Sequence, residues 1–441
     1  MSRYETYKPS GIDWIGEVPE HWERKKIGRC FQTIGSGTTP EAGNSDYYEE
    51  GTINWINTGD LNDGDIIECE KQITKEALDK HSVLKIYPKG TVLIALYGAT
   101  IGKTGILQIE GATNQACCAL ADSPFIIPKF TFYWTNAVKD FLLTQSYGGG
   151  QPNISQEIIR QLRIYLPSKS EQLAIANYLD DQTQKIDRLI ANKKAQTEKL
   201  KELRQIEINN AVTKGLNPNA EMKDSGIEWL GKIPKHWEYK RLKDLANVVL
   251  GKMLQNDDSG SDELKPYLRS FNVQWERVDL TDVKEMWLSE YEKLQYRLRE
   301  NDIIVSEGGE VGRAAIWKNQ IEECYIQNSV HKVTCKSKIN PNYLLYQFTL
   351  LGKAGVFDMI INKVSIGHLT REKLVDVKFL APPISEQIQI ANYLQKRTSA
   401  IDQLIKNIEA QIEKLQELRK IKIYEAVTGK IKVNAYAETT A

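Results

Sequence analysis

The sequence predicts an α+β protein that is written twice: two mixed α/β domains separated by two long helices, which pair as an antiparallel coiled coil about a pseudo-two-fold axis. Three observations predict this architecture. A segment near the start of the chain returns 215 residues later, a second segment returns at the same offset, and the stretches after the second segment have no internal proline or glycine. At 441 residues the chain is also too long for one ordinary core.

The internal repeat consists of two motifs. Ser10–Glu23 returns as Ser225–Glu238 with the pattern Gly-Ile-x-Trp-(Ile/Leu)-Gly-x-(Val/Ile)-Pro-x-His-Trp-Glu. Ser170–Leu179 returns as Ser385–Leu394 with the pattern Ser-Glu-Gln-x-x-Ile-Ala-Asn-Tyr-Leu. Such a repeat indicates a duplicated structural unit. The residues between the motifs barely match, so a common frame carries two different inserts. This pattern suits a protein whose variable parts discriminate and whose fixed parts assemble.

Domain boundaries follow from the motifs. Residues 1–166 form a first domain, 167–223 a central long helix with a linker, 224–381 a second domain, and 382–441 a C-terminal long helix with a tail. Short β-rich runs at 53–56, 91–97 and 105–109 have loose counterparts at 303–306 and 314–317. Each domain ends with a short helix, followed by a strand that runs into Pro167 or Pro382. We therefore expect two mixed α/β domains.

The segments 170–214 and 385–429 are rich in Leu, Ile, Ala, Glu, Lys and Gln, which predicts two long helices. Ser168 with Glu171 resembles a capping box, and Gly215 and Gly429 stand where the helices should end. At about 1.5 Å per residue each helix is about 65 Å long. An antiparallel pair would return the second helix to the first domain.

An apolar stripe predicts that the two helices pack on each other. In the second helix the stripe repeats every seven residues, and in the first helix Lys193 and Gln196 interrupt it. Its members are Ile401, Leu404, Ile408, Leu415 and Leu418 in the second helix, and Ile186, Leu189, Leu200 and Leu203 in the first.

Composition limits the class of function. The net charge is zero, which argues against a protein that holds DNA alone, because affinity for the duplex comes largely from Lys and Arg. The chain has no apolar run of about 18 residues and no signal-peptide pattern, so we expect a cytoplasmic protein with no membrane contact. Its six cysteines show no C-x-x-C spacing, and the adjacent Cys117 and Cys118 look like small core residues.

Two motifs come close to known sites and fail. Gly98–Thr104 resembles a phosphate-binding loop, but it has three residues between its glycines where four are needed, so we expect a tight turn that offers one basic side chain. Asn340-Pro341-Asn342-Tyr343 resembles a methyltransferase loop without a glycine-rich cofactor loop, and a proline in the first turn of a helix explains it. We predict no catalytic, cofactor-binding or metal-binding residues.

The chain resembles the specificity subunits of type I restriction-modification systems over nearly its whole length. The resemblance rests on the two repeated motifs, on Trp55-Ile-Asn57-Thr58-Gly59-Asp60-Leu61, and on Tyr97-Gly-Ala-Thr100-Ile-Gly102-Lys103. The second domain departs from the Trp-Ile-Asn-Thr-Gly-Asp pattern and has Tyr267-Leu-Arg269-Ser-Phe-Asn272 instead.

The resemblance implies a non-catalytic DNA recognition subunit with two target recognition domains. Each domain would read one half of a bipartite, asymmetric site in double-stranded DNA, and the helices would set the spacer. The implied partners are two modification subunits, which methylate adenine, and restriction subunits, which translocate and cleave DNA. S-adenosylmethionine, ATP and Mg would then be bound by the partners and not by this chain. The alternative is a specificity-like subunit of another methylation-based phage-defence system.

Candidate DNA-contacting residues are polar or basic side chains in expected turns, because Arg and Lys distinguish guanine, and Asn and Gln distinguish adenine, in the major groove. In the first domain these are Thr38, Asn57, Thr58, Tyr97, Thr100, Lys103, Gln151 and Asn153. In the second domain they are Lys252, Arg269, Asn272, Arg313, Lys363, Ser365 and His368.

The repeated motifs supply the candidate partner-docking residues. These are Trp14, His21, Trp22, Tyr178, Trp229, His236, Trp237 and Tyr393. Packing within the chain is the competing interpretation of the same residues. An enzyme that binds nucleotide or S-adenosylmethionine and a purely structural scaffold are the other hypotheses, and the scaffold leaves the divergence of the two inserts unexplained.

Overall fold

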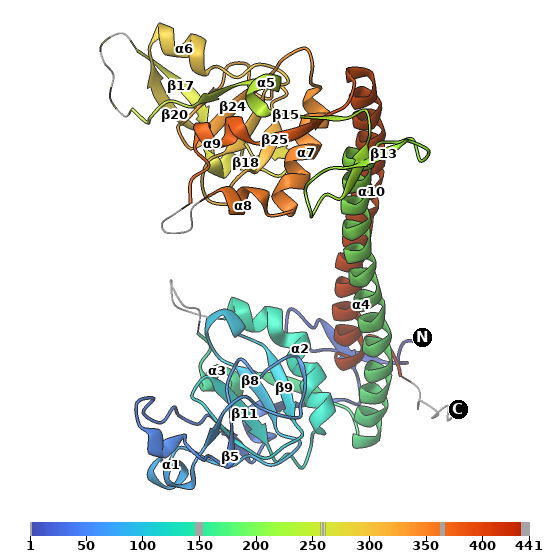
Figure 1. The fold of residues 1–441 in the computed structure, drawn as a ribbon. Helices are drawn as coiled ribbons and strands as arrows, with labels where there is room; N and C mark the ends of the chain where they lie inside the picture. Colours follow the sequence, from blue (N-terminus) through green and yellow to red (C-terminus); the bar gives the residue numbers. More distant parts are fainter. Residues whose placement is uncertain are drawn as a thin grey trace. The chain divides into compact units, whose positions relative to one another are not determined.

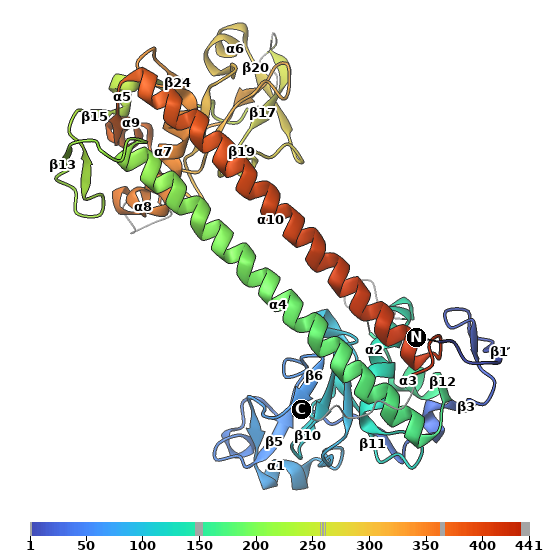
Figure 2. The same ribbon diagram turned by 90° about the vertical axis from the view of Figure 1, so that its right-hand side faces the viewer.

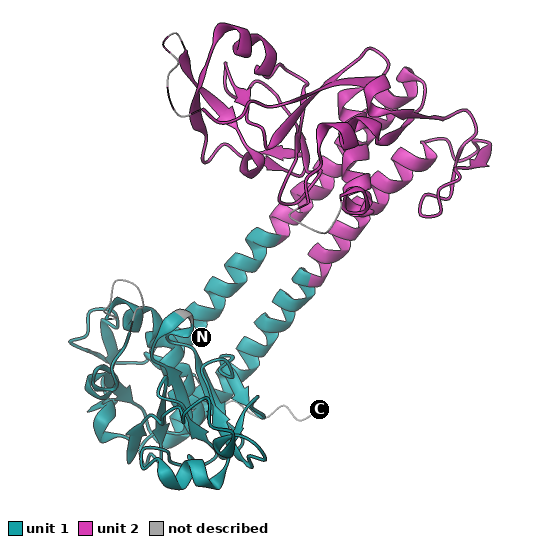
Figure 3. Cartoon of the chain, turned by 60° about the vertical axis from the view of Figure 1, so that its left-hand side comes forward, with its two compact units in different colours: residues 1–194, 409–441 teal, residues 195–408 magenta. Residues whose placement is uncertain are grey.

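The computed structural model describes residues 2–145, 153–255, 257, 260, 262–361 and 367–433, and it divides into two compact units (Figure 3). Unit 1 consists of residues 1–194 and 409–441, and unit 2 consists of residues 195–408. The boundaries lie inside the two long helices, so each unit contains one α/β domain and a part of both helices (Figure 1).

The described part of the unit 1 domain has four sheets and three short or medium α-helices. Its strands are β1 (Tyr7–Pro9), β2 (Glu17–Pro19), β3 (Glu23–Lys26), β4 (Thr33–Gly35), β5 (Ile53–Ile56), β6 (Gly64–Ile66), β7 (Gln72–Ile73), β8 (Val92–Ala95), β9 (Thr104–Leu107), β10 (Ala112–Thr113), β11 (Cys117–Ala121) and β12 (Arg163–Leu166). Its helices are α1 (Lys75–Lys80), α2 (Pro128–Thr144) and α3 (Gln156–Gln161). The predicted strands at 53–56, 91–97 and 105–109 are confirmed as β5, β8 and β9.

The domain of unit 2 repeats this plan with different details. Its strands are β13 (Met222–Asp224), β14 (Lys232–Pro234), β15 (Glu238–Arg241), β16 (Ala246–Leu250), β17 (Glu263–Leu268), β18 (Val273–Gln274), β19 (Arg277–Val278), β20 (Lys284–Leu288), β21 (Ile303–Ser306), β22 (Ala314–Ile316), β23 (Tyr325–Ile326), β24 (Val330–Cys335) and β25 (Lys378–Ala381). Its helices are α5 (Leu242–Leu245), α6 (Glu290–Tyr296), α7 (Pro341–Lys353), α8 (Val356–Ile360) and α9 (Arg371–Asp376).

The central sheets of the two domains share the order of four strands. Unit 1 orders its strands β4-β11-β8-β9-β6, and unit 2 orders them β16-β24-β21-β22. Beside each lies a three-stranded sheet, β10-β5-β7 or β20-β17-β23, with one parallel pair and one antiparallel pair. Strand β6 extends only the central sheet of unit 1. The corresponding part of the chain in unit 2 forms the hairpin β18-β19.

Strands β8 and β11 of unit 1 are apolar throughout because both faces of the central sheet are covered. In unit 1 the side chains of Ile94 and Cys118 pack with helix α2, whereas Ala95 and Cys117 pack on the side of the three-stranded sheet. Successive side chains of a strand point to opposite faces, so the two adjacent cysteines enter different cores. Both are fully buried, which confirms their prediction as core residues.

The two long helices are α4 (Lys169–Lys214) and α10 (Ile384–Val427), within two residues of the predicted bounds. In unit 1 the N-terminal part of α4 lies beside the C-terminal part of α10 (Figure 2), and Arg419 Nε donates to Asp187 at 3.0 Å. In unit 2 the order is reversed, with Arg204 Nε 2.9 Å from Asp402. Within each unit the helices are therefore antiparallel, as predicted.

The predicted apolar stripe is only partly the contact between the helices. Ile186 and Ile401 are buried, but four members of the stripe are exposed: Leu189 at 49%, Leu203 at 37%, Leu404 at 51% and Leu418 at 39%. The exposed residues occupy the d positions of the heptad. Side chains one residue later, at the e positions, are less exposed: Thr197 is buried and Ile405 is half-buried. The helices thus pack through their a and e positions, so the predicted stripe lies between the helices at its a positions and is exposed at its d positions.

The end of α10 packs on the N-terminal segment of unit 1. Lys432 N donates to the carbonyl of Ser2 at 2.9 Å, and Tyr7 Oη donates to the carbonyl of Gly429 at 3.0 Å. Gly429 has a φ of +72°, as does Gly215 at the end of α4, which confirms both predicted helix ends. The second helix therefore returns to the first domain. Within the described part of the chain, every helix is too short or too polar to span a bilayer.

Candidate nucleic-acid interface

The repeated motifs join each domain to the start of a long helix. Glu171, in the first turn of α4, accepts from Trp22 Nε1 at 3.2 Å and lies 3.1 Å from His21 Nε2. Glu386, in the first turn of α10, accepts from Trp237 Nε1 at 3.2 Å and lies 2.8 Å from His236 Nε2. Both indoles are fully buried. We call this cluster of a histidine, a tryptophan and a glutamate the clasp, and each unit contains one.

The clasp corrects the predicted capping box. Ser168 Oγ accepts from the backbone N of Glu171 at 3.3 Å, which is half of the box. The Glu171 carboxylate turns to the indole of Trp22 and not back to the backbone of Ser168. A charged acceptor on a buried N–H is a stronger bond than a cap to an exposed terminus, which accounts for the choice.

The predicted docking residues fall into two groups. Trp22, Trp237 and Tyr178 are at most 2% exposed, so they support the surface rather than form it. The other five lie at least partly at the surface: Trp14, His21, Trp229, His236 and Tyr393. Tyr393 Oη donates to Glu207 of α4 at 2.7 Å.

Each domain carries the same turn after the first strand of its three-stranded sheet. After β5, the backbone N of Asn57 donates to Asp60 Oδ2 at 2.7 Å, and after β17 that of Arg269 donates to Asn272 Oδ1 at 3.0 Å. The backbone N of the fourth residue also donates to the carbonyl of the first in both turns. The two sequences that did not align therefore form one structural motif, in which Arg269 and Ser270 replace Asn57 and Thr58.

A second turn follows the strand β8 or β21. Gly102 and Gly312 have φ values of +74° and +80°, and each precedes a basic residue, Lys103 or Arg313. This confirms the prediction of a tight turn that carries one basic residue. The turn leads into strand β9 or β22 and not into a helix, which also explains why a phosphate-binding loop does not form. Arg313 donates to the carbonyl of Ser270 at 3.1 Å and to Gln274 Oε1 at 3.2 Å.

A third segment lies directly before α3 or α9. The backbone N of Ile154 donates to the carbonyl of Leu96, and that of Leu369 donates to the carbonyl of Glu307, so this segment is bonded to the second turn in both domains. Asn153 and His368, which immediately precede these bonded residues, therefore occupy equivalent positions. His368 lies close to Gly308 of the second turn, since the Cβ of an alanine at that position would be 3.6 Å from its Nδ1. Burial raises the pKa of the Glu307 carboxyl, and the nearby His368 opposes that rise.

Sequence reasoning missed a further pair of amide residues. Asn114 and Gln327 follow β10 and β23, and each side chain accepts from the backbone N two residues later, at 3.0 and 3.3 Å. Asn114 Nδ2 donates to Asn57 Oδ1 at 3.0 Å, so it lies beside the first turn. The signal in the sequence was the run Thr113-Asn114-Gln115 between two apolar segments. Gln115 is exposed and accepts from Thr39 Oγ1.

These segments bring most of the predicted first-domain residues together. Asn57, Thr58, Tyr97, Thr100, Lys103 and Asn153 are half-buried at or beside the three turns, and Thr38 lies next to Trp55, whose Nε1 donates to its carbonyl at 3.2 Å. Gln151 lies outside the described residues.

In the second domain two of the residues predicted to contact DNA instead form hydrogen bonds within the domain. Lys252 is 6% exposed and donates to Glu292, Gln255 and the carbonyl of Trp287. Asn272 is fully buried, and its Nδ2 donates to the carbonyls of Asp279 and Asp282. Neither side chain is presented at the surface. Arg269 and Arg313 are half-buried, His368 is exposed, and Lys363 and Ser365 lie outside the described residues.

The first turn of the second domain presents an aromatic ring. Phe271 is 48% exposed and occupies the place of Gly59 in the first domain. The guanidinium of Arg269 lies 5.1 Å from the centre of this ring and forms an ion pair with Asp282. A stacked guanidinium and an exposed ring are suited to contact bases and their methyl groups.

Among the described residues no group of three or more His, Cys, Asp or Glu side chains could hold a metal ion. The Asn-Pro-Asn-Tyr motif is the start of α7: Asn340 Oδ1 accepts from the backbone N of Tyr343 at 3.1 Å, and Tyr343 is fully buried. Pro128 begins α2 in the same way, so the prediction of a proline in a first helical turn is confirmed.

Comparisons with known proteins agree on one family. The family model described as "Type I restriction modification DNA specificity domain" matches residues 19–201 and again 234–414, and the two matches begin 215 residues apart. The MjaVIII specificity subunit of Methanocaldococcus jannaschii, a type I restriction enzyme, is 27% identical over 94% of both chains. The EcoKI specificity subunit of Escherichia coli K12 is 21% identical over 96% of this chain and 92% of its own.

Solved structures share the fold. A chain from a study of complex assembly and conformational transition of the type I R-M system has a TM-score of 0.73 at 15% identity and covers 94% of this chain and 99% of its own. The HsdS subunit of Thermoanaerobacter tengcongensis has a TM-score of 0.54 at 16% identity, with 94% and 98% covered.

Proposed function

Because this chain belongs to the family of type I restriction-modification DNA specificity proteins, we propose that each α/β domain reads one half of a bipartite, asymmetric DNA site and that α4 and α10 set the spacer. The chain is a DNA recognition subunit and is not itself the enzyme. Adenine methylation and DNA cleavage would belong to partner subunits, which would also bind S-adenosylmethionine, ATP and Mg.

One observation carries this proposal: the same three segments recur in both domains with different side chains at equivalent positions. Asn57 is replaced by Arg269, and Lys103 is replaced by Arg313. Amide side chains suit adenine, and guanidinium groups suit guanine. A frame that is kept while its polar side chains change supports the reading of two different half-sites.

The repeated exposed apolar residues support docking of two modification subunits. Leu189, Leu418 and Ile421 in unit 1 correspond, at the offset of 215, to Leu404, Leu203 and Ile206 in unit 2, and all six are between 37% and 51% exposed. Apolar side chains in rows on helices are suited to pack against partner helices. Because both units present the same set, two copies of one partner would bind in equivalent ways.

The neutral charge supports a requirement for those partners. Several basic side chains near the three turns are already engaged with carboxylates, as Lys252 is with Glu292 and Arg269 with Asp282. Contacts to DNA phosphates dominate the affinity of most DNA-binding proteins. The isolated chain would bind duplex weakly and gain affinity in the complex with modification subunits.

Mapping of methylated adenines tests the proposal. The full chain would be co-expressed with its modification subunit in a host that has no other adenine methylation, and the genome would be sequenced by a method that detects methyladenine. We expect one interrupted, asymmetric sequence with two defined halves. A continuous or palindromic site, or no methylation by a folded complex, would reject it. Restriction of unmodified phage DNA by the complex with restriction subunits would separate a type I system from another methylation-based defence system.

A further inference from the structure

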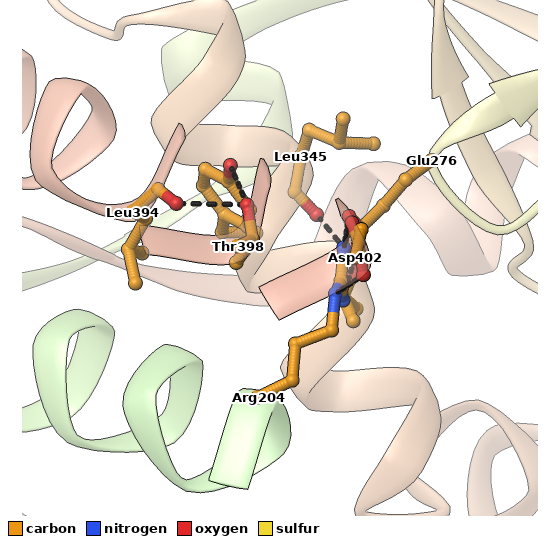
Figure 4. Close-up of polar contacts among 8 residues, drawn as sticks. Arg204, Glu276, Leu345, Leu394, Thr398 and Asp402 are labelled. Atoms are coloured by element: carbon orange, nitrogen blue, oxygen red, sulfur yellow. Dashed lines mark hydrogen bonds and ion pairs between the residues drawn. The ribbon is translucent and has the colours of Figure 1, made fainter. Parts of the chain in front are cut away.

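One arginine of α4 joins the long helices to the second domain. Arg204 Nε donates to Asp402 of α10 at 2.9 Å, while its Nη1 and Nη2 donate to Glu276 Oε1 and Oε2 at 3.2 and 2.6 Å (Figure 4). Arg204 and Glu276 are only 21% and 18% exposed at their side chains. Such a bidentate pair fixes both distance and orientation, which a single charge contact does not.

Glu276 lies at the tip of the hairpin β18-β19. Its φ is +60°, its backbone N donates to the carbonyl of Ala314 at 2.8 Å, and its Oε1 accepts from Thr349 of α7 at 3.1 Å. A positive φ at a glutamate is costly, so the contacts around it determine this conformation. Arg204 is therefore one of the groups that hold the tip of this hairpin in place.

The hairpin continues directly into the first turn of the second domain. Val273 pairs with Val278 at its base, and the backbone N of Asp279 donates to the carbonyl of Asn272 at 2.7 Å. Arg313 bonds both the turn, at the carbonyl of Ser270, and the hairpin, at Gln274. A displacement of the hairpin tip would thus reach the residues proposed to contact DNA.

Unit 1 has the same pair of helix residues without this third partner. Arg419 and Asp187 stand 215 residues from Arg204 and Asp402, and Arg419 Nε donates to Asp187 at 3.0 Å. Asp63 takes the place of Glu276, because it has a φ of +57° and its backbone N donates to the carbonyl of Thr104 at the start of β9. Its carboxylate, however, accepts from Thr104 and Lys139.

The unit 1 counterpart is also more open. A cavity of about 500 Å³ is lined by Asp63, Lys139 and Arg419, among others, at the position where unit 2 has its ion pair. In unit 2 an ion pair thus joins α4 to the hairpin. In unit 1 the corresponding carboxylate of Asp63 is bonded within the domain instead.

We propose that Arg204 is a positioning residue for DNA recognition by the second domain: through Glu276 it fixes the hairpin β18-β19, and with it the turn 269–272, on the helix pair. This inference rests on the proposed function of that turn. It assigns to Arg204 an effect on one half-site only, because its counterpart Arg419 does not hold the equivalent turn of the first domain.

Methylation mapping of variants tests the inference in the complex. Arg204→Met and Glu276→Gln should raise methylation at sites with one changed base in the second half-site about tenfold relative to the cognate site, and should leave the first half-site as strict as before. Thr349→Val, which removes one bond to Glu276, should have a smaller effect in the same direction. Arg204→Lys should recover part of the discrimination.

Arg419→Met is the matched control and should leave both half-sites unchanged. Equal relaxation by Arg204→Met and Arg419→Met, relaxation of both half-sites, or unchanged discrimination in Arg204→Met would each overturn the inference.

Hydrogen exchange on the full chain without DNA separates this inference from the proposed function. Arg204→Met should speed exchange about tenfold or more at 270–279 and leave 57–66 unchanged. If exchange at 270–279 is as slow as in the wild type, the positioning role is wrong, whatever the DNA result. If Arg204→Met speeds exchange at 270–279 but even the wild type methylates no bipartite site, the proposed function is wrong. Arg204 would then still hold the hairpin in place.

Discussion

Trp22 donates its buried indole N–H to Glu171 at 3.2 Å, and this bond helps to join the first domain to the start of α4. Tyr4 Oη donates to the same carboxylate, so Glu171 also holds the N-terminal segment. In the other unit Glu386 accepts the equivalent hydrogen bond from Trp237. The repeated motifs are therefore, first of all, joints within the chain.

Removal of that carboxylate should destabilise the unit that contains it. Glu171→Ala leaves a buried indole N–H without its acceptor, which costs about 1–3 kcal/mol. For a unit of this size that loss corresponds to a decrease in Tm of about 2–4 °C per kcal/mol. Calorimetry of the full chain would measure it. Glu171→Gln keeps an acceptor and should lose less, and Glu198→Ala, on an exposed part of α4, should be neutral. Equal loss in all three variants would contradict a role for the clasp.

Acid should weaken unit 2 through His331. This histidine is fully buried, its Nε2 lies 2.7 Å from the carbonyl of Leu369, and burial lowers its pKa below the usual value, with Glu372 opposing and Arg371 adding to the shift. The unfolded chain therefore binds a proton near pH 6.5 while the folded chain does not. The stabilisation is complete above about pH 6.5 and is lost as the pH falls.

Denaturant unfolding between pH 7.5 and 5.5 would check this. One proton contributes a slope of at most about 1.4 kcal/mol per pH unit. His331→Gln keeps a donor for Leu369 without titrating, and it should flatten the dependence. Cys118 occupies the equivalent position in unit 1, so unit 1 should lack this contribution. Parallel pH profiles for the wild type and His331→Gln would show that His331 is not the source.

Exchange of one insert should change one half of the recognised site. Replacing residues 20–160 with the corresponding segment of a relative keeps the clasp, because His21 and Trp22 belong to the repeated motif. Methylation mapping should then show a new first half-site beside the original second half-site. A change in both halves would mean that the two domains do not read separately.

Lengthening both helices should lengthen the spacer. Four residues inserted between Lys194 and Ala195, with four more between Ile408 and Glu409, keep the pairs Asp187–Arg419 and Arg204–Asp402 intact on either side. Four residues add about 6 Å and about 40° of rotation beyond a full turn. Two base pairs add about 7 Å and roughly 70°.

We therefore expect the same half-sites with one or two more base pairs between them. Insertion into α4 alone breaks the register and serves as the comparison. Methylation at the original spacing by the doubly extended protein would exclude the helices as the ruler.

Charged substitutions on the exposed helix rows should remove partner binding one site at a time. Leu189→Asp should leave one modification subunit bound per chain, Leu404→Asp should do the same, and the double variant should bind none. Both leucines are about half exposed, so the chain itself should fold normally. Native mass spectrometry gives the stoichiometry. Full occupancy in the double variant would place docking elsewhere.

The architecture was predictable because its signals are local. Periodicity, capping residues and helix-ending glycines define α4 and α10, and apolar runs between turn residues define strands such as β5, β8 and β21. The expected antiparallel pairing of the two helices then predicted the return of the second helix to the first domain. The predicted pairing face of each helix was right for the a positions and wrong for the d positions, because a two-helix contact can use the a and e rows as well as the a and d rows.

The candidate interface was predictable only in outline. Turn positions follow from glycine and polar residues, but whether a side chain there is free depends on contacts across long sequence distances. Lys252 donates to Glu292, 40 residues later, and the side chain of Asn272 accepts a hydrogen bond from Arg269 within the same turn. Asn114 was missed because nothing in its segment indicates that β10 runs parallel to β5 and brings it beside Asn57.

The four-residue turn after β5 and β17 has a consequence for how such proteins diversify. Its geometry depends on backbone groups and on one short side chain at the fourth position, which is Asp60 in one domain and Asn272 in the other. The first three positions contribute little to closing it and vary from Asn-Thr-Gly to Arg-Ser-Phe. Mutations at those three positions can therefore accumulate with little penalty to folding. Selection by changing invaders could then act on recognition while the residues that assemble the complex stay fixed.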